Sequence, residues 1–474
     1  MARAFRSSAT KLKGQAFMPS KPMLAEHVTA ACAAKLRCEL STSSPALAAK
    51  RILDDDDRGV FRYASEKEKR TPRMYVWGYA KTGALGVRTF VKPERGAVAK
   101  VRDVQTKPYR LKFADHYPIR DVACGYGFTV YIPKGRSDDY MLLGTGLNVD
   151  SQLGYHETRK GSGVSLGLVA QPVPIHLPVI HQNTKVVNVA CGRAHTVVLT
   201  DQEGVMSLGN NAFGQCGRSV VKDEKYSSNR IISKVKGLPS NVSSVVCGKD
   251  STFFLTGDGQ VYSCGISSCG QSGAGVYSDV SIPTLIKGDI EGEKIVQLSS
   301  NGGSVLALSD SGEIYGWGSS EYYQLSSVTE EIQVNVPRHL PIHRCGKAIQ
   351  VAVTETVCAF LNTDGHVYVW GCGILGLGPE NNLVKQPTRI PEVLFGHNEL
   401  NPDSRVVQLA SGHGHFAGIK DNGDLYTWGY NSMASLGLGH KKDQYFPIKV
   451  IIAAEVKKVV CGADHMVAMA KSVT

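Results

Sequence analysis

Residues 190–209 read ACGRAHTVVLTDQEGVMSLG, and this stretch contains both markers of a repeat that runs through the chain. The pair Cys191-Gly192 lies at its start, and a mainly apolar run ends at Gly209. The pair Glu203-Gly204 between two apolar runs is a strong signal for a tight β-hairpin turn. The stretch therefore predicts two antiparallel strands, the first of which is HTVVLT.

The second marker, a Trp-Gly pair or a substitute for it, recurs seven times. Successive copies are 53 to 66 residues apart. The pairs Cys191-Gly192 and Cys247-Gly248, and the substitute Ser411-Gly412, precede this marker by 17 residues. Seven units of this length, each with about four short strands, match the blades of a β-propeller. The marker glycines are Gly78, Gly144, Gly209, Gly265, Gly318, Gly371 and Gly429.

The two ends of the repeat region complement each other. The first Trp-Gly pair, Trp77-Gly78, has no Cys-Gly pair before it, and the last Cys-Gly pair, Cys461-Gly462, has no Trp-Gly pair after it. Pairing residues 73–78 with residues 456–470 would complete a seventh blade and remove two free sheet edges. The sequence therefore predicts an all-β fold, a seven-bladed β-propeller closed by pairing of its N- and C-terminal strands.

Charge is concentrated in the first part of the chain. The 474 residues carry a net charge of +11, and residues 1–53 hold nine Lys or Arg against two acids, with no acid before Glu26. This composition, rich in Ala, Ser and Thr, is typical of a mitochondrial transit peptide, and the alternative is a basic tail that binds nucleic acid. We predict a transit peptide over 1–53, a charged linker over 54–71 and the propeller over 72–474.

Residues with potential chemistry coincide with the repeat. Cys191 and His195, like Cys461 and His465, share a Cys-x3-His spacing that could suggest a dyad or a metal pair. Because the spacing recurs in different blades, we expect these side chains to be core groups, and no C-x2-C pair indicates zinc. We assign structural roles to Trp77, Gly78, Cys191, Gly192, His195, Trp317, Trp370, Trp428, Cys461, Gly462 and His465.

A catalytic or cofactor site is not indicated. Residues 371–376 match G-x-G-x-x-G after a strand, but no helix is expected after them to receive a pyrophosphate, and no Walker loop occurs. We therefore predict a binding protein with no cofactor, no metal and no catalytic residues.

A basic stretch interrupts the repeat near its start. Residues 88–112 carry a net charge of +6, and we interpret 87–118 and 155–185 as the longest insertions between strands. Such a stretch could contact RNA phosphates, or it could be a solvated loop. The candidate RNA- or partner-binding residues are Arg88, Lys92, Arg95, Lys100, Arg102, Lys107, Tyr109, Arg110 and Lys112.

The motifs VYVWG, SQLG and CGRAHTVVLT resemble those of the regulator of chromosome condensation family of seven-bladed propellers. The N-terminal composition, together with YRLKF, ACGYGFT, NNAFGQCGR and CGADHM, is similar to that of the mitochondrial members. Residues 72–474 are covered by this resemblance.

The resemblance implies two activities. One is a part in mitochondrial ribosome biogenesis, with large-subunit ribosomal RNA and assembly factors such as pseudouridine synthases as partners. The other is guanine nucleotide exchange on a dynamin-related fusion GTPase of the inner membrane, with one of the two insertions as the wedge. It implies a matrix location, free or peripheral on the inner membrane, and no DNA partner. A purely structural adaptor with neither activity is the alternative.

Overall fold

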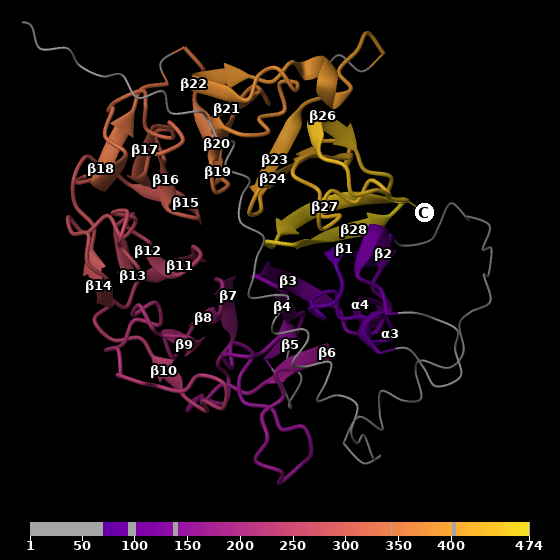
Figure 1. Cartoon of the computed structure of the whole chain (residues 1–474), viewed down its shortest axis with the longest axis vertical. Helices are drawn as coiled ribbons and strands as arrows, with labels where there is room; N and C mark the ends of the chain where they lie inside the picture. Colours follow the sequence, from indigo (N-terminus) through magenta and orange to yellow (C-terminus); the bar gives the residue numbers. More distant parts are fainter. Residues whose placement is uncertain (1–69, 93–100, 136–140, 343, 401–403, 474) are drawn as a thin grey trace, which may run out of the picture. The chain divides into compact units, whose positions relative to one another are not determined.

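The computed structural model describes residues 70–92, 101–135, 141–342, 344–400 and 404–473. These residues form seven four-stranded antiparallel sheets, which lie in a ring as the blades of a propeller (Figure 1). The predicted fold class is confirmed. The transit peptide, and the linker except Arg70 and Thr71, lie outside the described residues.

Each blade has an inner strand near the ring axis and an outer strand at the rim (Figure 1). The inner strands are β3 (Ile119–Cys124), β7 (Val186–Cys191), β11 (Val242–Cys247), β15 (Ile295–Asn301), β19 (Ala348–Val353), β23 (Val406–Ser411) and β27 (Ala454–Cys461). The second strands are β4 (Phe128–Pro133), β8 (His195–Thr200), β12 (Ser251–Thr256), β16 (Ser304–Ser309), β20 (Val357–Asn362), β24 (His415–Lys420) and β28 (His465–Ser472). The third strands are β5 (Leu142–Leu147), β9 (Val205–Gly209), β13 (Val261–Gly265), β17 (Ile314–Ser319), β21 (Val367–Cys372), β25 (Leu425–Gly429) and β1 (Pro72–Tyr79). The outer strands are β6 (Leu168–Ile175), β10 (Ile232–Lys234), β14 (Val280–Leu285), β18 (Gln333–Leu340), β22 (Leu383–Arg389), β26 (Gln444–Lys449) and β2 (Val104–Arg110).

The blade that closes the ring takes strands from both ends of the propeller, in the order β27, β28, β1, β2. Strand β1 pairs with β28 over seven of its eight residues, from Pro72 opposite Lys471 to Gly78 opposite His465. The predicted pairing of residues 73–78 with 456–470 is therefore confirmed. We call this sheet the closing blade and number the others 1 to 6 in chain order, from β3–β6 to β23–β26.

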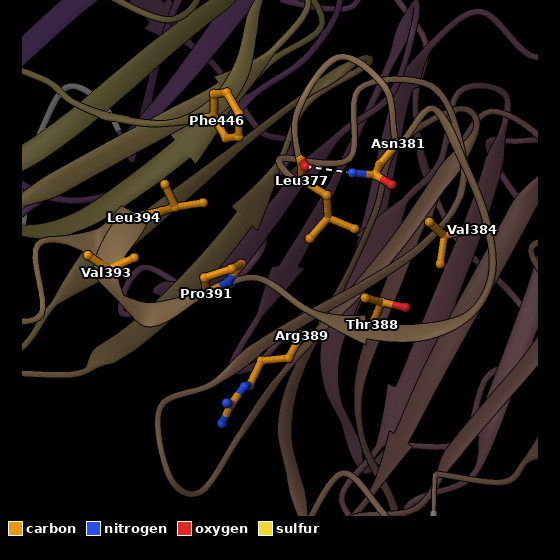
Figure 2. Close-up of a pocket in the computed structure, with 9 residues that line it drawn as sticks. All are labelled: Leu377, Asn381, Val384, Thr388, Arg389, Pro391, Val393, Leu394 and Phe446. Carbon is orange, nitrogen blue, oxygen red and sulfur yellow. Dashed lines mark hydrogen bonds between the residues drawn. The ribbon is translucent and has the colours of Figure 1, made fainter.

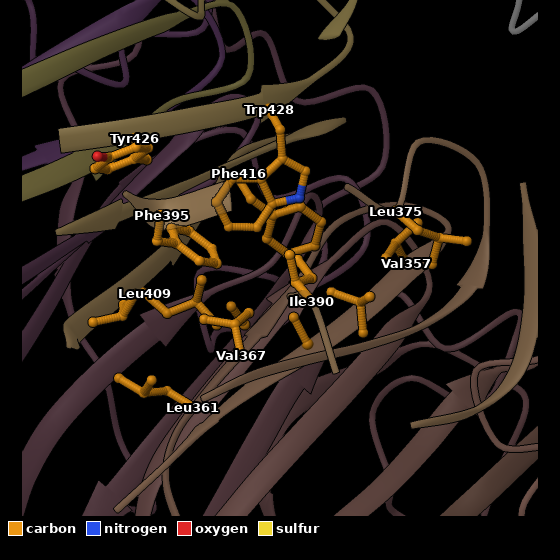
Figure 3. Packing of buried hydrophobic residues seen from close by; sticks show 14 residues of the cluster. Val357, Leu361, Val367, Leu375, Ile390, Phe395, Leu409, Phe416, Tyr426 and Trp428 are labelled. Carbon is orange, nitrogen blue, oxygen red and sulfur yellow. The ribbon is translucent and has the colours of Figure 1, made fainter. Parts of the chain in front are cut away.

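Clusters of buried apolar side chains lie between neighbouring blades. Figure 3 shows the cluster between blades 5 and 6, where Phe416 stacks on Trp428 at a centroid distance of 5.4 Å. Because each sheet is covered on both faces, its central strands are apolar throughout. The continuous apolar sequence of strands such as β8, HTVVLT, is thus explained by these layers.

The tryptophans predicted to be structural are fully buried and join one blade to the next. The Trp77 indole N–H of the closing blade donates to the backbone oxygen of Ser435 in blade 6 at 2.7 Å. Equivalent bonds join Trp317 to Gln271 at 3.0 Å and Trp370 to Gln324 at 2.7 Å. These three indoles therefore fasten a strand to the loop of the preceding blade, whereas the buried Nε1 of Trp428 has no hydrogen-bond partner in the described part of the chain.

The marker glycine after tryptophan is required by close approach of two strands. Gly78 has a φ of +112°, and a Cβ there would lie 2.5 Å from the Asp464 carbonyl oxygen and 2.6 Å from the His465 Cα. Only glycine tolerates both the dihedral angle and the contact. The structural role assigned to this position is consistent with this geometry.

The basic stretch near residue 100 differs from its interpretation as a single insertion. Residues Val104–Arg110 form β2, the outer strand of the closing blade, and the short helices α3 (Arg88–Val91) and α4 (Lys112–His116) flank it. Likewise β6 occupies part of the second predicted insertion. Elsewhere the 3-10 helix η1 (Glu392–Phe395) packs near β26. No helix in the described part of the chain is long and apolar enough to cross a membrane.

Candidate interaction face

One face of the ring carries two sets of connections. Because all neighbouring strands are antiparallel, the turn after each inner strand and the loop between the third and outer strands emerge on the same side. We call this side the hub face. The second-to-third strand turns and the connections to the next blade lie on the opposite face. The hub turns are residues 125–127, 192–194, 248–250, 302–303, 354–356, 412–414 and 462–464.

A hydrogen-bond network crosses the ring axis at the hub. Tyr126 of blade 1 donates its hydroxyl to Asn301 Oδ1 of blade 4 at 3.1 Å and lies 3.2 Å from His413 Nδ1 of blade 6. His413 Nε2 in turn lies 3.0 Å from Glu355 Oε2 of blade 5. These groups come from blades on opposite sides of the ring, so their hydrogen bonds link those blades across the ring axis.

The protonation of the network follows from burial and pairing. Burial, and secondarily the Glu355 carboxylate, raises the pKa of the Tyr126 phenol well above its usual value, so the hydroxyl remains a donor. The hydrogen bond from His413 holds the pKa of Glu355 below its usual range. Beside them, Arg193 pairs with Asp250 at 3.0 Å. The hub is thus a polar, internally paired platform.

Sequence reasoning missed this network. Tyr126 and His413 follow the glycine of the Cys-Gly pair or its substitute, Glu355 holds the equivalent position, and Asn301 ends an inner strand. The repeat has no fixed residue type at these positions. The available signal was that large polar side chains occupy one repeat position in most blades, where Gly302 and Ala463 are the small exceptions. Their contact across the axis, however, depends on ring geometry and could not be read from spacing.

The hub-face loops are unequal in length. Three consecutive blades, the closing blade and blades 1 and 2, carry the long loops 80–103, 148–167 and 210–231. The corresponding loops of blades 3 to 6 are shorter: 266–279, 320–332, 373–382 and 430–443. We call the described residues of the three long loops the loop ridge. The third long loop was not among the predicted insertions.

Contacts between neighbouring loops hold part of the ridge in place. Ser151 donates its hydroxyl to the Tyr226 backbone oxygen at 2.8 Å. The Arg230 guanidinium lies over the Tyr155 ring at 4.0 Å and 3.4 Å from Glu157. Loops of blades 1 and 2 therefore form one surface, which suits a rigid contact with a partner.

The hub face is electrically polarised. The loop ridge contains ten Lys or Arg against five Asp or Glu. The short loops of blades 3, 4 and 5 contain five acids and no Lys or Arg. A partner that meets this face is therefore oriented by opposite charges on the two halves.

The predicted basic residues that the structure describes lie on β2, on its flanking helices and in the loop 80–103 of the closing blade, so Arg88, Lys92 and Arg102 also belong to the loop ridge. Lys107, Tyr109 and Arg110 lie on β2, and Arg95 and Lys100 lie outside the described residues. The exposed members described here are Arg88, Lys92, Arg102, Lys107, Arg110 and Lys112.

Part of this basic surface is structural. Tyr109 packs edge-on against Phe90 at 5.0 Å, and the Arg102 guanidinium covers the same Phe90 ring at 4.5 Å. Arg110 pairs with Asp115 at 3.0 Å. Tyr109 therefore contributes to packing of the rim and is not an open platform for stacking a base.

The repeated Cys and His residues lie between blades. His195 Nε2 bonds Thr252 of the next blade at 3.0 Å, and His465 Nε2 bonds Thr129 in the same way at 2.8 Å. Cys191 and Cys461 are unpaired thiols, and burial raises the pKa of each. Among the described residues, no three His, Cys, Asp or Glu side chains come together as a metal site.

A cavity of about 570 Å³ lies at the rim between blades 5 and 6 (Figure 2). Leu377, Val384, Leu394 and Phe446 make it largely apolar, and Asn381 donates to the Leu377 backbone oxygen at 2.9 Å. Its lining contains one ionisable group, Arg389, and no nucleophile or acid-base pair. The cavity offers a contact surface and no evident chemistry.

Comparison with known proteins identifies the family. Residues 69–399 match the RCC1-like domain, and residues 406–433 and 422–469 match the regulator of chromosome condensation (RCC1) repeat. The chain belongs to the RCC1 family. The family resemblance predicted from the repeat motifs is confirmed, and this RCC1-family propeller has relatives of high identity.

Two curated relatives cover most of the RCC1-family chain. The mouse RCC1-like G exchanging factor-like protein is 47% identical over 422 residues, which are 88% of this chain and 91% of that protein. The human protein of the same name is 46% identical over 421 residues, which are 87% of this chain and 90% of that protein.

Solved structures agree with the RCC1 propeller fold. Human WBSCR16 superposes with a TM-score of 0.79 at 45% identity, covering 85% of this chain and all of that chain. Prp20p from Saccharomyces cerevisiae, studied for its binding to Gsp1p and histones, superposes with a TM-score of 0.68 at 20% identity. That match covers 85% of this chain and 92% of Prp20p, and it supports the fold alone.

Proposed function

We propose that this RCC1-family propeller is a guanine nucleotide exchange factor that binds its GTPase through the hub face. The observation that carries the proposal is the 46–47% identity, over nearly the whole propeller, to the RCC1-like G exchanging factor-like proteins. The loop ridge supports the choice of face, because it rises from three adjacent blades of an otherwise regular ring.

Exchange requires binding and no catalytic side chain. A protein that binds the nucleotide-free GTPase more tightly than the loaded form weakens nucleotide binding by the same factor, because the two affinities are linked. The paired hub network supplies a rigid platform, and the ridge supplies a projecting element that can press toward the nucleotide site. The polarised charges set the orientation of the encounter.

The partner we propose is a dynamin-related fusion GTPase of the inner mitochondrial membrane. A mitochondrial location, in the matrix or peripheral on the inner membrane, is supported by the basic, acid-poor composition of residues 1–53.

A second function in mitochondrial ribosome biogenesis is favoured by the basic rim of the closing blade. Six exposed Lys or Arg side chains there could neutralise phosphates of large-subunit ribosomal RNA. Assembly factors such as pseudouridine synthases would then be neighbours on the same RNA.

The test is release of fluorescent GDP from the purified dynamin-related GTPase. We expect the full-length propeller to accelerate release and, at saturation, to weaken the affinity of the GTPase for GDP by roughly 5- to 150-fold, the range typical of coupled ligands. A variant with Lys160, Lys222 and Lys225 changed to Glu reverses ridge charge and should lose most of this acceleration.

The matched control changes Lys236, Lys287 and Lys294 to Glu on the opposite face, and it should exchange like the wild type. A pull-down should also favour the nucleotide-free GTPase over the GDP- and GTP-loaded forms. Equal capture of all three forms, or no acceleration at any concentration that saturates binding, would contradict the exchange function.

A further inference from the structure

The outer strands of all blades except blade 2 bulge at the same place. In blade 6, three residues of β26, from Tyr445 to Pro447, lie opposite the single residue Trp428 of β25. Bulges re-aim side chains, and here each one presents two residues before a proline at the rim of the ring. The equivalent bulges in blades 1, 3, 4 and 5 and the closing blade are residues 170–172, 281–283, 335–337, 385–387 and 106–108.

Only the bulge of blade 6 contains aromatic residues among these six. Tyr445 and Phe446 are 39% and 41% exposed. The bulges on either side each contain a lysine, Lys385 in blade 5 and Lys107 in the closing blade. Three consecutive blades therefore present a lysine, two aromatic rings and a second lysine along the rim.

Backbone hydrogen bonds fix the positions of these bulges. The Gly378 N–H of blade 5 donates to the Tyr445 backbone oxygen at 3.0 Å. The Gly439 N–H of blade 6 donates in the same way to the Thr106 oxygen of the closing blade at 2.8 Å. Because each bulge is held against the loop of the preceding blade, its exposed side chains project from a rigid frame.

The loop between the third and outer strands of blade 6 adds positive charge beside the rings. Lys441 and Lys442 directly precede Asp443 and β26. Both lysines and Lys107 are exposed, and none of the three forms an ion pair with a described residue. Asp443, the one acid of this loop, accepts a backbone N–H within the loop at 2.7 Å. Unpaired cations thus flank the aromatic pair.

The surroundings of Phe446 leave room for a planar group. Phe446 borders the rim cavity of about 570 Å³ between blades 5 and 6, together with Leu377 and Val384 (Figure 2). A flat ring that lies on Phe446 can therefore also contact the apolar lining of this cavity.

We propose that this part of the rim binds single-stranded RNA, with bases stacked on Tyr445 and Phe446 and phosphates at Lys107 and Lys442. The site rests on the second proposed function, because Lys107 belongs to the basic rim described there. Tyr109 of that rim is packed, so the stacking surface comes from the neighbouring blade. Exposed aromatic rings stack on unpaired bases, whereas the bases of a duplex are already stacked on one another, so the ligand is a single strand.

The experiment measures binding of a fluorescein-labelled oligouridine of about ten nucleotides to the full-length protein by anisotropy. The matched ligand is an oligomer of the same length whose riboses carry no bases. Stacking contributes about 5- to 150-fold in affinity per base. We expect the double variant Tyr445→Ala, Phe446→Ala to bind oligouridine at least about tenfold more weakly. Its affinity for the base-free oligomer and its salt slope should equal those of the wild type, since no charge is removed.

Tyr277→Ala is the matched control, because Tyr277 is 48% exposed in the short loop of blade 3, which contains no Lys or Arg. It should bind both oligomers like the wild type. The double variant Tyr445→Phe, Phe446→Tyr keeps two aromatic rings and should retain its affinity for oligouridine, which separates stacking from a folding defect. Lys442→Ala removes a phosphate contact and should weaken both oligomers.

The outcomes separate this site from the second function. If the wild type does not bind oligouridine, both are overturned. If binding depends on Lys107 but tolerates the loss of both aromatic rings, the second function stands and the stacking site is overturned. An equal loss of affinity for the base-free oligomer, or a loss confined to GTPase binding, would also overturn the stacking site.

Discussion

Three histidines at the same repeat position have different protonation states. Burial lowers the pKa of His195 and of His415 to about 3, so both are neutral near pH 7. Burial also opposes charge on His465, but Cys124 and the Asp464 carboxylate, 2.9 Å from Nδ1, raise its pKa to about 10. Asp464 has no carboxylate counterpart beside the other two histidines, since Ala194 and Gly414 precede them.

The free energy of unfolding depends on pH in opposite directions for the two neutral histidines and for His465. An unfolded histidine has a pKa near 6.5. His195 and His415 bind protons more readily when unfolded, so the free energy of unfolding falls from about pH 6.5 toward pH 3. His465 holds its proton when folded, so its contribution is present below about pH 6.5 and is lost as the pH rises toward 10.

We predict that Asp464→Asn reduces this alkaline loss of stability. Removing the carboxylate lowers the pKa of His465, so folded and unfolded states differ less in bound protons above pH 6.5. Thermal unfolding from pH 6 to 10, with NMR titration of the histidine ring protons, measures both quantities.

Asp250→Asn is the matched control for this prediction, because Asp250 holds the same turn position before Ser251, where no histidine follows. Its alkaline slope should equal that of the wild type. An unchanged pKa of His465 in Asp464→Asn would contradict the assignment.

At the scale of elements, β2 shows why a basic stretch was difficult to assign. VQTKPYR alternates polar and apolar residues only weakly and has no repeat marker. Its positive charge therefore led to its interpretation as a basic insertion. It is nevertheless an outer strand, paired with β1 from Tyr75 opposite Arg110 to Tyr79 opposite Val104. Strands whose role is set by a neighbour 30 residues away carry little signal of their own.

The RNA hypothesis belongs to this element and its flanking helix. Changing Arg88, Lys92 and Lys107 to Glu should weaken binding to a large-subunit ribosomal RNA fragment. Losing three phosphate contacts should reduce the slope of log affinity against log salt by about 2, from roughly 0.7 per contact. A filter-binding titration across salt concentrations measures both quantities.

The opposite-face variant with Lys236, Lys287 and Lys294 changed to Glu alters the total charge equally and is the control. It should bind with the wild-type slope. Equal loss in both triple variants would mean that only net charge matters, and the rim would then have no specific role.

For the whole molecule, the sequence was most informative where one pattern repeats. The marker spacing and the unmatched ends predicted seven blades and their closure, because each blade must satisfy the same local strand and turn geometry. The Trp77 bond to Ser435 and the Tyr126 network were not predictable in the same way. Both join residues that only the closed ring brings together.

Closure should make the propeller one cooperative unit. A chain that ends at Asp464 lacks β28, so β1 loses its neighbour and the cluster between the closing blade and blade 6 loses Met466, Ala468 and Ala470. We expect a single, much lower unfolding transition by calorimetry, with loss of all seven blades together. Burial of the Met466 side chain is worth about 1.5–3 kcal/mol, and burial of each alanine methyl group about 0.8 kcal/mol.

A chain that ends at Ser472 keeps every β1–β28 pair and is the control for this truncation. It should melt like the full-length protein. A chain ending at Asp464 with an unchanged melting temperature would show that the stability of the ring does not depend on the pairing of β1 with β28.

The closing blade can form only after almost the whole propeller has been synthesised. Its third strand, β1, leaves the ribosome before any other blade strand, whereas its second strand, β28, leaves after all of them. At about 5–20 residues per second, the roughly 390 residues between these strands take on the order of 20–80 s to synthesise. During that interval β1 has no partner on one side, and its apolar edge is a natural binding site for a chaperone.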